Sequence, residues 1–203
     1  MEVNSLLILE ELHYHRVFIR TDGQPTILDV EPIVSTAEVV TFISDALDYA
    51  LFIRGIEGFI SPLDTGEIQK NNAVKRYFNF DIGDAIAHEC AVEVSRRIVL
   101  ENGFDVDIFL DLPKAEAMKY AKRFIGLVIF KSRPVNTSFI NALAFSSTLC
   151  CVAAENNRLN WMNCIALSAV FIFQAYFPYE WIYFDFKHWA FTYVFRHKQI
   201  HHG

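Results

Sequence analysis

The chain has 203 residues, a formal charge of −6 and a pI of about 5.6. This acidic balance argues against an electrostatic nucleic-acid binder, which normally carries a basic face. Hydrophobic residues make up 53% of the chain and charged residues 21%. This composition excludes a disordered polar chain and predicts a globular protein with a substantial core.

The first 34 residues predict a β-hairpin. Two segments, at about 6–20 and 26–34, are rich in Ile, Val, Phe and Tyr, and Asp22–Gly23 between them supplies the turn chemistry of a hairpin. Further strands are predicted at 58–60 and at 107–112, where the sequence reads DIFLDL.

The segment 36–54 shows the helical pattern most clearly. Ser35 and Glu38 form a capping box at its start, apolar residues recur at helical spacing along it, and Gly55 follows its end. A weaker helix is predicted at 66–78.

Two more helices complete the first part of the chain. One is predicted over 82–102, with Asp81 as the N-cap and Gly103 as the C-cap. The other is predicted over 113–130, with Pro113 in its first turn.

The composition changes at Pro134. Residues 134–203 contain four Lys or Arg and three Asp or Glu, whereas residues 1–133 contain the other 14 and 21. The second part predicts helices at about 136–154, 159–177 and 179–200. We therefore expect two regions, an acidic one at 1–133 and a hydrophobic, aromatic-rich helical one at 134–203. The expected fold class is α+β, with a small N-terminal sheet packed on helices.

Two apolar runs, at 137–154 and 161–184, are each about as long as a membrane span. Ser, Asn and Gln side chains dilute both runs, and an apolar helix also occurs at the centre of a soluble bundle. The sequence favours burial in a soluble core and leaves a membrane hairpin as the alternative.

The chain ends in FRHKQIHHG, which suggests a metal site. On a helix, His197 and His201 lie four residues apart and share a face, as metal ligands often do. The pattern from His197 to His202 resembles one histidine box of the membrane fatty-acid desaturase and hydroxylase families, which implies a di-iron centre built from several such boxes. These six residues are the whole resemblance, so we expect a polar terminus that holds no functional metal.

Two other histidine clusters are candidate sites. Asp84 and His88 lie four residues apart on the predicted 82–102 helix, where a carboxylate and an imidazole can ligate a metal. On the first strand of the predicted hairpin, His13 and His15 would lie on one side together with Glu11. In both places we favour a solvated polar surface over a metal site, and we predict no cofactor.

The four cysteines form no C-x-x-C pair. Cys150 and Cys151 are adjacent, which is poor geometry for a disulfide. The sequence therefore indicates reduced, mostly buried thiols and a cytoplasmic location, with membrane association left open.

The lack of an assembled catalytic motif favours a non-enzymatic interaction or assembly subunit that associates with itself or with a protein partner. The alternatives are a membrane-anchored protein with a cytosolic N-terminal domain and an iron- or zinc-dependent enzyme that uses the clustered histidines. Large aromatic side chains dominate interface energetics. The predicted interface residues are Trp161, Phe171, Phe173, Trp181, Phe184, Trp189 and Phe191.

Overall fold

A computed structural model describes residues 33–56, 77–92 and 94–200, with the side chains of a few helical residues left out. In these ranges 83% of the residues are helical and there is no strand or sheet. The helices are α2 (Thr36–Ile53), α3 (Phe80–Val92), α4 (Val94–Glu101), α5 (Val106–Asp111), α6 (Lys114–Lys131), α7 (Val135–Glu155), α8 (Leu159–Tyr176) and α9 (Glu180–Ile200).

The α+β prediction is therefore wrong for the described part of the chain. The segment 107–112, predicted as a strand, lies mostly in the short helix α5. The side chain of Asp105 caps this helix by accepting a hydrogen bond from the backbone N of Ile108 at 3.0 Å. Phe109 is fully buried and packs edge-on against Trp161. An N-cap and one buried ring therefore stabilise a short helix where the sequence DIFLDL indicated a strand.

The other predicted strands fall outside the described residues. The hairpin and the 58–60 strand lie within 1–32 and 57–76, apart from the last hairpin residues. Ile33 there forms an isolated antiparallel bridge with Tyr179. The predicted 66–78 helix is also undescribed except for Tyr77 and Phe78, which are not helical.

The capping predictions for α2 are confirmed. Ser35 Oγ accepts a hydrogen bond from the backbone N of Glu38, and the Glu38 carboxylate accepts one from the backbone N of Ser35. Gly55 follows the helix with a φ of 69°, a left-handed conformation that costs a glycine little.

The predicted 82–102 helix is two helices, α3 and α4. Asn79 takes the capping role predicted for Asp81, because Asn79 Oδ1 accepts a hydrogen bond from the backbone N of Ile82 at 3.0 Å. Gly103, with a φ of 83°, follows the end of α4 as predicted.

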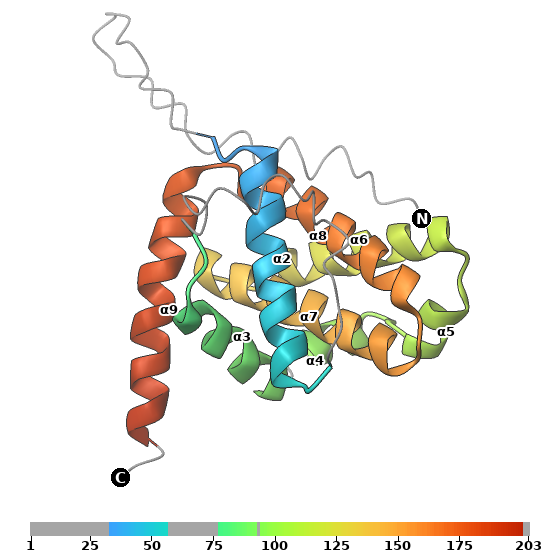
Figure 1. The fold of residues 1–203 in the computed structure, drawn as a ribbon, viewed down its shortest axis with the longest axis horizontal. Coiled ribbons are helices and arrows are strands. Elements are labelled where there is room, and N and C mark those ends of the chain that lie inside the picture. Colours follow the sequence, from blue (N-terminus) through green and yellow to red (C-terminus); the bar gives the residue numbers. More distant parts are fainter. Residues whose placement is uncertain (1–32, 57–76, 93, 201–203) are drawn as a thin grey trace, which may run out of the picture. The chain divides into compact units, whose positions relative to one another are not determined.

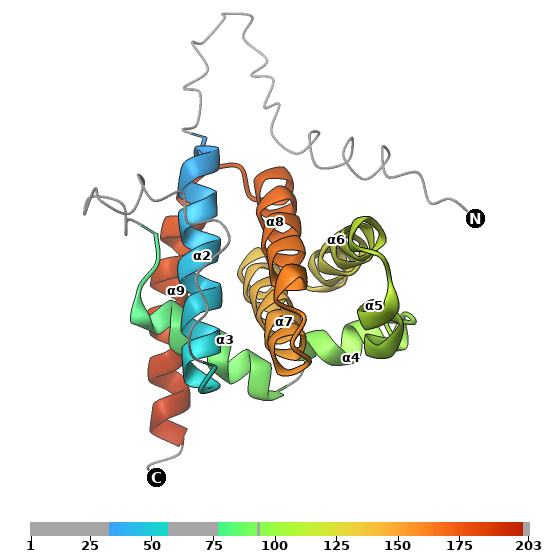
Figure 2. The same ribbon diagram turned by 45° about the vertical axis from the view of Figure 1, so that its right-hand side comes forward.

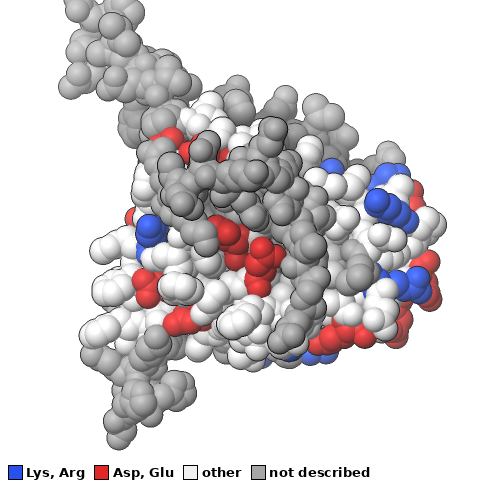
Figure 3. All heavy atoms as spheres, viewed as in Figure 1, with Lys and Arg blue, Asp and Glu red and all other residues white. Residues whose placement is uncertain are grey.

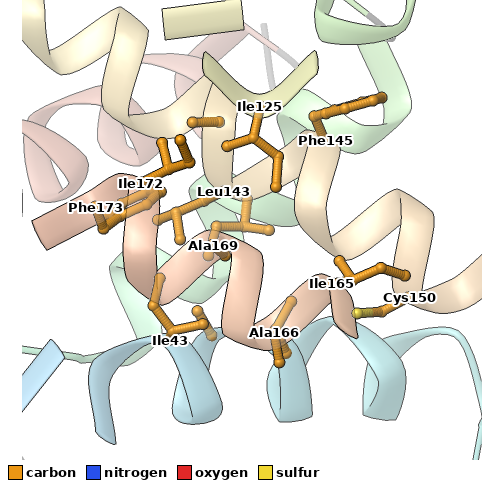
Figure 4. Close-up of a cluster of buried hydrophobic side chains, with 14 of the residues drawn as sticks. Ile43, Ile125, Leu143, Phe145, Cys150, Ile165, Ala166, Ala169, Ile172 and Phe173 are labelled. Atoms are coloured by element: carbon orange, nitrogen blue, oxygen red, sulfur yellow. The ribbon is translucent and has the colours of Figure 1, made fainter. Parts of the chain in front are cut away.

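Helix α7 lies at the centre of the described helices and packs against α2, α3, α4, α6, α8 and α9 (Figures 1 and 2). Small side chains let α8 approach its neighbours closely. Ala166 and Ala169 of α8 are fully buried, between Ile43 of α2 and Leu143 of α7 (Figure 4). Helices α6 and α7, which lie on the two sides of the composition boundary at Pro134, pack against each other.

Helix α7 is also the one described helix that is long and apolar enough to cross a membrane by length and composition. Of its most apolar window, 78% is buried among the other helices. The second apolar run, 161–184, is divided between α8 and α9 rather than forming one continuous helix.

Gly83 of α3 lies directly against the ring of Tyr49 on α2. A Cβ atom added there would lie 2.5 Å from Cε1 of Tyr49. The Tyr49 ring cannot easily move aside, because its hydroxyl donates a hydrogen bond to Asp84 Oδ1 at 2.7 Å and its ring lies against Phe78 and Phe80.

We expect Gly83→Ala to lower the free energy of unfolding by about 1–2 kcal/mol, because overpacking outweighs the gain in helix propensity. Chemical denaturation of Gly83→Ala, Tyr49→Ala and the double variant measures this effect. In the Tyr49→Ala background the same substitution should be neutral or stabilising by up to about 1 kcal/mol. Equal losses in both backgrounds would show that the Tyr49 ring is not the obstacle.

Candidate interaction surface

Helix α9 presents large apolar side chains on two faces. One face lies in the core and holds Ile182, Tyr183, Phe186, Ala190 and Val194, none of which is more than 7% exposed. The other face carries exposed side chains in a row, which we call the aromatic strip: Trp181, Phe184, His188, Phe191 and Phe195.

The aromatic strip follows from the spacing of its residues. Its members are separated by three, four, three and four residues, which places them along one side of an α-helix. Phe191 and Phe195 are each 56% exposed and their rings stack at a centroid distance of 6.5 Å. Trp181 and Phe184 are 40% and 43% exposed, and Phe184 also contacts the ring of Tyr77. The surface over α9 is mostly uncharged in Figure 3.

The structure divides the predicted interface residues. Trp181, Phe184 and Phe191 lie on the aromatic strip, and Phe171 is exposed on α8. The other three point inward: Trp161 and Phe173 are buried, and Trp189 is partly buried against the core. Phe195 also lies on the exposed face but was not predicted as an interface residue. It follows Phe191 by four residues, so it continues the alternate spacing of three and four residues.

Asp84 and His88, the predicted metal candidates on α3, are directed to different neighbours. Asp84 Oδ1 accepts a hydrogen bond from the hydroxyl of Tyr49 on α2. His88 Nδ1 lies 2.7 Å from the hydroxyl of Tyr193 on α9. Among the described residues, no group of three or more His, Cys, Asp or Glu side chains is arranged to hold a metal ion.

Tyr193 joins α9 to α3 through two polar contacts. Its hydroxyl donates a short hydrogen bond to Glu89 Oε1. Since that hydroxyl has a single proton, the His88 Nδ1–H must be the donor in the second contact. Burial, together with the hydrogen bond to Glu89 and its charge, raises the pKa of Tyr193 above its ordinary value. Tyr193 therefore stays neutral and holds the two helices together.

The predicted histidine site at the C-terminus lies almost entirely outside the described side chains. His197 is within α9, but the description of side chains ends before it, and His201 and His202 lie beyond the described residues.

The cysteine side chains are free and lie in or against the core. Burial raises the pKa of all four thiols, and that of Cys151 to about 11. They are therefore thiols at neutral pH rather than the thiolates that act as nucleophiles.

Comparison with known proteins identifies no relative: no protein-family model, curated protein sequence or solved structure matches the chain.

Proposed function

We propose that the protein is a non-enzymatic interaction or assembly subunit that binds another macromolecule through the aromatic strip of α9. The supporting observation is the exposure of four large rings on one side of a helix whose other side is anchored in the core. A contiguous patch of exposed apolar side chains on a protein often marks an interaction site.

The size of the strip supports this proposal. An aromatic side chain buries about 150–250 Å² when it is fully covered, and the four rings are 40–56% exposed. Together they offer roughly 400 Å² of apolar surface, within the range of about 300–600 Å² in which the largest patch of a monomer is often functional.

The anchoring of α9 also suits a binding role. Trp189 stacks on Phe186 and Tyr193 on the inner side of the helix, at centroid distances of 5.5 and 4.7 Å. Together with the contacts of Tyr193 to α3, these rings fix the position of α9 in the unbound protein. A rigid helix loses little conformational entropy on binding.

The Phe191→Ser/Phe195→Ser variant tests the proposal. We expect the native protein in a detergent-free extract of its own cells to migrate as a particle larger than its 23.4 kDa chain, and the variant to migrate as a monomer. Phe171→Ser is the matched control, because Phe171 is 57% exposed but lies on α8, with Lys122 of α6 over its ring. An unchanged particle size for the double variant, with unchanged helicity, would contradict the proposal.

A further inference from the structure

We infer that the partner covering the aromatic strip is a second copy of this chain, with the two α9 helices packed antiparallel about a twofold axis near His188. This inference rests on the proposed function and identifies the partner that binds the aromatic strip. Two features of α9 support it, the spacing of the strip and the order of charges along the helix, and the area of the strip sets the strength that we expect of the dimer.

The spacing is that of a helix–helix seam. Residues separated alternately by three and four positions form the row that packs against a second helix in a left-handed pair. His188 is the central member, with two aromatic residues on each side. In an antiparallel pair, Trp181 of one copy therefore lies opposite Phe195 of the other, and Phe184 lies opposite Phe191. Every ring of the strip then meets an aromatic ring, and the seam is self-complementary, as a twofold interface requires.

The charges along α9 favour the antiparallel direction. The first part of the helix contains Glu180 and Asp185, Lys187 lies beside its centre, and the last part contains Arg196 and Lys198. Asp185 is exposed and its Oδ2 accepts one hydrogen bond, from Asn136 Nδ2 at 2.9 Å. A parallel pair would place acidic residues beside acidic residues and basic beside basic. An antiparallel pair places the acidic part of each helix beside the basic part of the other.

Helix α9 is accessible and long enough to pair with a second helix along the whole aromatic strip. Its 21 residues extend over about 30 Å at 1.5 Å per residue. In both ribbon views α9 lies along one edge of the described helices (Figures 1 and 2). Two copies of the strip would cover roughly 800 Å² of apolar surface before flanking side chains are added, less than the 1,200–2,000 Å² or so of a stable complex. We therefore expect a reversible dimer that forms at micromolar concentrations.

Sedimentation velocity of the purified full-length chain between about 1 and 100 μM tests the inference. We expect the weight-average mass to rise with concentration from 23.4 kDa towards twice that value. Phe191→Ser/Phe195→Ser should weaken the association at least tenfold, and Phe171→Ser should leave it unchanged. His188→Asp, a surface substitution that brings two like charges together on the axis, should weaken it as well.

Mild oxidation of cysteine variants tests the direction of the helices. We expect dimer cross-links from His188→Cys and from a mixture of Trp181→Cys with Phe195→Cys, but none from Phe195→Cys alone. The wild-type chain, whose own cysteines are buried or partly buried, is the control. Cross-linking of Phe195→Cys with itself, as efficient as in the mixture, would overturn the antiparallel arrangement.

Two other results would overturn the inference: a wild-type monomer at every concentration, or a dimer that persists in both Phe191→Ser/Phe195→Ser and His188→Asp. Should purified protein be monomeric while the double variant still loses its large particle in cell extract, the second copy would be excluded and the interaction surface retained. If Phe191→Ser/Phe195→Ser changed neither the association of the purified protein nor the particle size in cell extract, both proposals would fail.

Discussion

Replacing Phe139 by alanine is expected to lower the free energy of unfolding by about 3–5 kcal/mol. Phe139 lies on α7, is fully buried and is the centre of an aromatic cluster. Its ring centroid lies 4.2–5.6 Å from the rings of five neighbours on or beside α2, α8 and α9: Phe42, Phe173, Phe177, Tyr183 and Phe186. Truncation removes these contacts and leaves a cavity that three other elements border.

Urea denaturation of the wild type and of Phe139→Ala measures this loss. Phe130→Ala is the matched control, because Phe130 is 54% exposed on α6 and its truncation should cost no more than about 0.5 kcal/mol. A loss below about 1 kcal/mol for Phe139→Ala would show that α7 does not occupy the centre of the folded protein.

The second large effect is expected from Tyr193→Phe, which should destabilise the protein by about 1–3 kcal/mol. The substitution removes one hydroxyl and with it the hydrogen bonds to Glu89 and His88. A hydrogen bond to a charged group is worth about 1.5–3 kcal/mol, and the lower part of our range allows for the partial exposure of this site.

Tyr183→Phe provides the matched comparison. The Tyr183 ring is fully buried, and its hydroxyl has no hydrogen-bond partner in the described structure. Burial raises the pKa of Tyr183 above its ordinary value. Removing an unsatisfied hydroxyl should stabilise the protein by up to about 1–2 kcal/mol. Thermal unfolding of the two variants should therefore move the Tm in opposite directions, and shifts of the same sign would contradict the described contacts.

Local signals in the sequence predict several elements well. The Ser35–Glu38 capping box and Gly55 give the ends of α2. The three C-terminal helices, predicted at 136–154, 159–177 and 179–200, begin and end within one residue of α7, α8 and α9. Caps and breakers act over three or four residues, so they can be recognised without knowledge of the tertiary structure.

The errors occur where tertiary packing decides the outcome. The short apolar segment 107–112 fits a strand by its sequence, but Phe109 packs among buried aromatic rings and Asp105 caps a helical turn. Likewise, nothing local shows that the predicted 82–102 helix divides into α3, which packs on α9, and α4, which packs on α6. A short apolar segment fits both a helix and a strand by its sequence, and its packing against the rest of the protein decides between them.

The candidate surface could be predicted only in part for the same reason. Helix α9 has aromatic residues on both faces, so its composition identifies an aromatic helix but not the side that meets the core. Trp189 and Phe191 are two residues apart, and one faces the core while the other faces solvent. The three–four spacing of the strip, ending at Phe195, is visible in the sequence, and the packing of the opposite face on α3 and α7 shows that this strip is the exposed one.

The native particle size of Phe191→Ser/Phe195→Ser, measured beside Phe171→Ser, tests the central claim most directly. All three substitutions remove an exposed phenylalanine, so any general effect of lowering surface hydrophobicity appears in both variants. We predict that the α9 variant loses its large particle while the α8 variant keeps it. Loss in both, or in neither, with both proteins folded, would contradict the assignment of the aromatic strip as the interaction surface.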